Sequence, residues 1–157
     1  MHLLAALVVL GAGGGIAAEA LAQTSPNQLI AQRKGAMNLQ AKYLGPVLGM
    51  ARGRVPFDAR IAQRNADYLA VVTQLAWDDF QQSTVGNANT RAKEDLYREP
   101  AKFKTAADAV QTDVQKLVSA ARSGDEAAVK SAAFGLARSC NSCHESFATF
   151  EFRFPVQ

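Results

Sequence analysis

The sequence has few cysteines, histidines and tryptophans: its 157 residues include two cysteines, two histidines and one tryptophan. Two cysteines three positions apart close too short a loop to stabilise a fold, which excludes the disulfide framework of a small secreted domain. The 17 basic and 14 acidic residues form no basic run, so the charge pattern gives no support for nucleic-acid binding. No segment alternates between apolar and polar residues as a β-strand does.

The first 22 residues differ from the rest of the chain. A short apolar run, Leu3 to Leu10, leads through a Gly- and Ala-rich stretch to Ala20-Leu21-Ala22, a small-residue pattern typical of signal peptidase sites. The apolar run is too short for a membrane span, because glycines interrupt it from Gly11 onward. We therefore predict a signal peptide at 1–22, although its start lacks lysine and arginine, and one domain at 23–157. A retained amphiphilic anchor is the alternative.

Four helical patterns fill the predicted domain. Ser25 and Pro26 begin the first, which runs to about Ala51. Asp58 caps the second, whose apolar side is Ile61, Tyr68, Leu69, Val72 and Leu75. Pro100 opens the third, which ends at Gly124, and Asp125 caps the fourth, whose apolar stripe steps from Val129 to Phe150. Residues 77–99 lack a sustained period and predict a long crossover loop. This pattern predicts an all-α, antiparallel four-helix bundle.

Both cysteines and one histidine stand together in "RSCNSCHESF", residues 138–147. On a helix, Cys140 and Cys143 are an i, i+3 pair, so both thiols project from the core-facing side of the helix. His144 lies beside them. The C-x-x-C-H pattern is the signature of covalent haem attachment: two thiols react with the two vinyl groups of one macrocycle, and the imidazole reaches the iron. We expect one haem c attached through Cys140 and Cys143, with His144 as the iron ligand.

Three other roles for these residues are weaker. A thioredoxin-like pair stands at the start of a helix that follows a strand, and no such pattern occurs here. A structural zinc site needs four ligands, whereas the mature chain offers Cys140, Cys143 and His144. A disulfide between positions i and i+3 of a regular helix has unfavourable geometry.

The whole predicted mature chain resembles the cytochrome c′ family of bacterial periplasmic haem proteins. The resemblance rests on a carboxy-terminal "CNSCHESF", on "RKGAM" at 33–37, on "GPVLGMARGRVPFDA" at 45–59 and on "LYREPAKF" at 96–103. It implies a four-helix bundle, one covalent haem, a periplasmic location, no membrane association after signal cleavage, and a homodimer that packs through the first two helices.

The resemblance also implies roles on the far side of the haem. Arg33 and Met37 are four residues apart and share one helix face. The position of Met37 carries the bulky residue over the open haem face, and that of Arg33 lies near a propionate, with Lys34 beside it. If these roles do not apply, Met37 is an ordinary residue of the hydrophobic core and Arg33 is a solvated surface charge. Arg91 and Lys93 are further candidates for a propionate.

One position departs from the family pattern. Many relatives carry arginine or lysine four residues after the haem histidine, where this chain has Ala148. We therefore expect weaker hydrogen bonding on the His144 side of the haem. The aromatic tail continues with Phe152 and Phe154, which we expect to cover a bundle end or a subunit contact.

These features lead to two candidate functions. In the first, His144 is the only strong iron ligand, Met37 is a steric lid, and the protein binds NO and CO and exchanges single electrons with a redox partner protein. In the second, the Met37 sulfur is the sixth ligand of a low-spin electron carrier. An enzyme is not expected, because no distal histidine or acid-base pair stands near Met37.

Overall fold

Each long helix begins at a residue suited to a helix amino terminus. The computed structural model describes residues 24–149 and 152–157, so the predicted signal peptide lies outside the described residues. In α1 (Pro26–Ala51), Ser25 and Gln28 form a reciprocal capping box. The Asp58 side chain caps α2 (Ala59–Val72), and Asp125 caps α5 (Glu126–Phe147). Pro100 opens α4 (Pro100–Ser123), which ends at Gly124 in the left-handed conformation, φ +71°.

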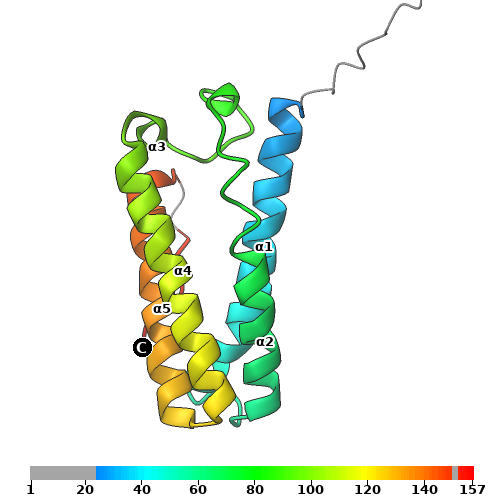
Figure 1. Cartoon of the computed structure of the whole chain (residues 1–157), viewed down its shortest axis with the longest axis vertical. Helices are drawn as coiled ribbons and strands as arrows, with labels where there is room; N and C mark the ends of the chain where they lie inside the picture. Colours follow the sequence, from blue (N-terminus) through cyan, green and yellow to red (C-terminus); the bar gives the residue numbers. More distant parts are fainter. Residues whose placement is uncertain (1–23, 150–151) are drawn as a thin grey trace, which may run out of the picture.

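The four long helices run along the long axis of the molecule, as Figure 1 shows. Helix α1 contacts α2 and α5, and α4 contacts the same two helices. Short turns join α1 to α2 and α4 to α5, which makes these neighbours antiparallel. The prediction of an all-α, antiparallel four-helix bundle is confirmed. Among the described residues, no helix is both long and apolar enough to span a membrane.

The main core fills the space between the four helices, and the buried side of α2 differs from the predicted one. Leu69 and Val72 are buried as expected, but Ile61, Tyr68 and Leu75 are 38%, 46% and 57% exposed. The buried stripe instead includes the small residues Ala62 and Ala66. Helix α2 therefore approaches its neighbours through small side chains, and its larger apolar residues form a separate outer stripe.

The crossover between α2 and α4 is more ordered than a loop. It contains a 3₁₀ turn (Gln82–Thr84) and the short helix α3 (Asp95–Arg98). Ala92 pairs with Ala148 in an isolated antiparallel bridge beside the end of α5. The Lys93 ammonium donates to the carbonyls of Glu145 (2.7 Å) and Ser146 (3.3 Å). Lys93 therefore caps the carboxyl end of α5, and this bond anchors the crossover to the helix that carries Cys140, Cys143 and His144.

Candidate haem site

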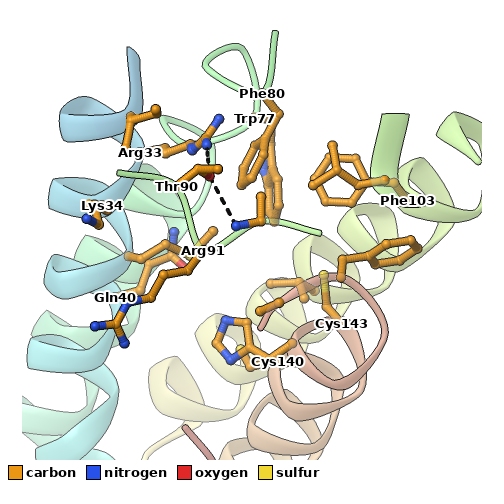
Figure 2. A pocket seen from close by; sticks show the side chains of 18 of the residues that line it. Arg33, Lys34, Gln40, Trp77, Phe80, Thr90, Arg91, Phe103, Cys140 and Cys143 are labelled. Atoms are coloured by element: carbon orange, nitrogen blue, oxygen red, sulfur yellow. Dashed lines mark hydrogen bonds between the residues drawn. The ribbon is translucent and has the colours of Figure 1, made fainter. Parts of the chain in front are cut away.

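A cavity of about 510 Å³ lies between α1, the crossover, α4 and α5. All six predicted site residues line it: Arg33, Lys34, Met37, Cys140, Cys143 and His144. Figure 2 shows the two cysteines on α5 across the cavity from Arg33 and Lys34 on α1. The sequence separates these groups by about a hundred residues, and the antiparallel contact of α1 with α5 brings them together.

The cysteine pair provides one wall of the cavity. Cys140 and Cys143 are 8% and 9% exposed and form no disulfide. Cys140 belongs to the main core, whereas Cys143 packs with Leu96 and Phe147 in a smaller cluster below the crossover. Burial raises the pKa of Cys140 to about 12 and that of Cys143 to about 11. A redox-active thiol needs a lowered pKa, so these protonated thiols fit covalent attachment better than thiol exchange.

His144 stands between this cavity and a second one. The second cavity, about 270 Å³, lies on the outer side of α5 and is also lined by Phe152 and Arg153. Burial lowers the pKa of His144, and a hydrogen bond with the backbone of Phe152 opposes that shift. A neutral imidazole can present a ring nitrogen to a metal.

Met37 and Lys34 lie on the opposite wall, on α1. Met37 is half-buried and faces the cavity, so its thioether is part of the lining rather than of the main core. Lys34 is exposed at the rim, where its Nζ donates to the Asn89 carbonyl at 3.0 Å. The apolar residue and the cation therefore occupy different depths of the same wall.

Arg33 is 3% exposed, which excludes the solvated surface charge considered above. Its Nη1 donates to the Asp79 carbonyl (3.1 Å), Thr84 Oγ1 (2.9 Å) and Tyr97 Oη (3.4 Å), and its Nη2 donates to Thr90 Oγ1. Within residues 24–149 and 152–157, the guanidinium forms no ion pair with a carboxylate. Burial and the neighbouring Asp78 raise the pKa of Asp79, and the charge of Arg33 opposes that rise, so this carboxylate is a counter-charge beyond ion-pair distance. An anionic group in the cavity would stabilise the buried guanidinium further.

The rest of the lining includes residues that sequence reasoning did not assign to the site. Trp77, Phe80 and Phe103 form an aromatic group on one side, with Trp77–Phe103 and Phe80–Phe103 ring centroids 6.1 and 5.0 Å apart. Gln40 is buried one turn beyond Met37. For Trp77 and Phe80 the only available signal was the presence of large aromatic residues in the segment predicted as a loop, whereas Phe103 and Gln40 lie on α4 and α1. Arg91 also lines the cavity, whereas Lys93 caps α5 and lies outside it.

The residues present fit a haem. The volume lies within the range of about 300–1,000 Å³ typical of cofactor pockets. Two buried, unoxidised thiols and an imidazole stand on one wall, and aromatic rings supply an apolar lining. Among the described residues the buried Arg33 forms no ion pair, and propionates would supply one. Such a site could hold a macrocycle covalently and supply one nitrogen ligand to its iron.

Comparisons with known proteins agree with this geometry. The family model described as Cytochrome C′ matches residues 28–148. Cytochrome c′ of Rubrivivax gelatinosus is 34% identical over 78% of this chain and 95% of its own length. The crystal structure of that protein has a TM-score of 0.77, covering 80% of this chain and 98% of the other.

Two further relatives bear on function. A ferrous variant of Alcaligenes xylosoxidans cytochrome c′ with bound NO has a TM-score of 0.76 and 26% identity, covering 82% of this chain and 98% of the other. Cytochrome c-554 of Cereibacter sphaeroides is 30% identical over 84% of this chain and 89% of its own length. The fold, the cysteine pair and these matches show that the chain belongs to the cytochrome c′ family, whose cofactor is a covalently bound haem c.

Proposed function

We propose that this protein is a periplasmic haem protein whose iron has His144 as its only strong protein ligand, binds NO and CO, and exchanges single electrons. The observation that carries the proposal is the cavity wall on which Cys140, Cys143 and His144 meet, facing an apolar Met37. The NO-bound Alcaligenes relative supports gas binding. The proposed residues for attachment are Cys140 and Cys143, and the proposed ligand is His144.

The chain's own residues would control what reaches the iron. When bound, haem supplies a metal that exchanges one electron and binds diatomic ligands. Met37 and the aromatic lining exclude water and anions by their apolar surface, while a small neutral gas can enter if the Met37 side chain swings aside. Displacing a packed methionine costs about 1–3 kcal/mol, which disfavours larger ligands by roughly tenfold to hundredfold. Arg33 and Lys34 would hold the propionates.

The Met37 thioether suggests a second candidate, because it lies in the cavity and sulfur can bind iron. In that case the protein would be a low-spin electron carrier. The absorption spectrum of the resting protein distinguishes the two: a broad high-spin Soret band without a sulfur-to-iron charge-transfer band supports the open site. A low-spin spectrum with that band would establish Met37 as the sixth ligand.

Attachment is tested by extraction with acidified acetone. Protein from a host that attaches haem should keep a haem mass adduct, and Cys140→Ala should give a product with one linkage and lower stability. Ser142→Ala changes the same motif without removing a thiol and should keep the full adduct. Complete loss of haem from the wild-type protein into the solvent would refute the proposal.

We further propose a homodimer through α1 and α2. The outer stripe comprises one residue of α1 and residues of α2 and the following turn: Leu39, Ile61, Tyr68, Val71 and Leu75. Tyr68 packs against Tyr43 of α1 with ring centroids 4.8 Å apart, so the stripe is continuous across the two helices. A contiguous exposed apolar surface of this kind marks a contact site.

A further inference from the structure

The carboxy-terminal segment folds back along α5 rather than covering a bundle end. Figure 1 shows the chain passing from the end of α5 back along that helix to the carboxyl terminus. Phe154 is 8% exposed and belongs to the main core, with Val156 packed against it. Arg52, at the carboxyl end of α1, donates from Nε to the Gln157 carbonyl at 2.7 Å. The expected place for Phe154 at a bundle end is therefore wrong, because its ring fills the core beside α5.

One side chain joins this segment to the haem motif. Asn141 Nδ2 donates to the Phe154 carbonyl at 2.9 Å, and Asn141 Oδ1 accepts from the Phe154 N–H at 2.7 Å. A side-chain amide that makes both bonds to one residue replaces a strand partner and satisfies both backbone groups of Phe154. Asn141 is the first variable position of C-x-x-C-H, and its side chain points away from the cysteine wall toward the tail.

The tail held in this way contacts the predicted iron ligand. The Phe152 ring lies edge-on to the His144 imidazole, with centroids 6.3 Å apart. Arg153 pairs with Glu145 at 3.5 Å on the other side of the second cavity. Position 148, four residues after His144, carries only a methyl group. The tail therefore contributes Phe152 and Arg153 to the cavity beside His144, where the other polar lining residues are Lys93, Asn141, Glu145 and Thr149.

We propose that Asn141 is a positioning residue: it latches the segment 152–157 so that the Phe152 ring fixes the orientation of the haem ligand His144. The inference rests on the proposed function, in which His144 binds the iron. An imidazole whose ring is held in one orientation by an outer contact binds the metal more strongly than one that can rotate. The tail thus sets the strength of the iron–histidine bond, and Asn141 sets the position of the tail.

The test compares four forms of the haem-loaded protein: wild type, Asn141→Ala, Phe152→Ala, and the double variant. Ser142→Ala is the matched control, because it alters the other variable position of the motif and Ser142 is exposed. Resonance Raman of the ferrous protein gives the iron–histidine stretching band, and electrochemistry gives the reduction potential. Hydrogen–deuterium exchange of the Phe154 amide reports the latch without reference to the haem.

Asn141→Ala should move the iron–histidine band to lower wavenumber and raise the reduction potential, because a weaker histidine donor stabilises ferric iron less. Exchange of the Phe154 amide should accelerate by roughly tenfold or more once its acceptor is removed. The double variant should shift the band by less than the sum of the single variants, because both act through one contact. Ser142→Ala should match the wild type in all three measurements.

Three results would overturn the latch. They are an unchanged band in Asn141→Ala despite faster Phe154 exchange, additive shifts in the double variant, or an equal shift in Ser142→Ala. If Asn141→Ala does not fold, Asn141→Asp keeps an acceptor for the Phe154 N–H, removes the donor, and carries the same test. Failure of the proposed function is recognised separately, because the wild-type protein would then show no iron–histidine band.

Discussion

Replacing Arg33 by methionine tests whether the buried guanidinium organises the crossover. The substitution keeps a long apolar stem but removes four hydrogen bonds, which reach Asp79, Thr84, Thr90 and Tyr97. Hydrogen bonds to charged groups contribute about 1.5–3 kcal/mol each, and the burial cost of the guanidinium, several kcal/mol, offsets part of the total. We expect the free energy of unfolding to fall by about 3 kcal/mol. For a chain of this length, that lowers the melting temperature by roughly 6–12 °C.

Thermal unfolding of the haem-loaded protein, followed by far-ultraviolet circular dichroism, measures this loss. Lys34→Met is the matched control, because Lys34 is the neighbouring cation, is exposed, and makes one hydrogen bond to the crossover. It should change the melting temperature by no more than about 2 °C. Removing the buried charge should also lower the reduction potential, because a nearby cation favours the ferrous state. A variant that melts with the wild type, or no further below it than Lys34→Met, would refute the assigned role of Arg33.

Three other predictions address the lid, acid stability and assembly. Met37→Ala should speed CO association in flash photolysis while the resting iron stays high-spin; conversion from low-spin to high-spin would instead identify a sixth ligand, and no change in either would place Met37 in the core. Burial raises the pKa of Asp113, but hydrogen bonds from Lys116 and Ser139 outweigh it and hold that pKa below the usual 3.8. Stabilisation by Asp113 is therefore present above pH 3.8 and lost as the pH falls through the lowered pKa. Asp113→Asn should cost the same stability in denaturant titrations at pH 6 and pH 5 and progressively less below pH 3.8, and a difference that stays constant below pH 3.8 would contradict this. Val71→Lys should shift the protein toward monomer in analytical ultracentrifugation, whereas Ser131→Lys on exposed α5 should not, and equal effects would argue against the α1–α2 interface.

The sequence by itself determined the helix ends and the attachment motif, because both depend on residues close together in the chain. Ser25 caps α1 through Gln28, and Asp125 caps α5 through two amides within three residues of itself. Gly124 ends α4 because its φ of +71° suits glycine. Cys140, Cys143 and His144 lie within five consecutive residues of one helix, so their chemistry could also be predicted without a structure.

Tertiary structure alone decided which residues complete the site, because those contacts join distant positions. Arg33 is buried by crossover residues 46 to 64 positions away, and no local pattern separates it from a surface arginine. Helix α2 buries alanines and exposes larger residues because close helix contact, rather than hydropathy alone, selects its inner face. Asn141 meets Phe154 only because the tail reverses along α5, which places a residue of the haem motif against the end of the chain.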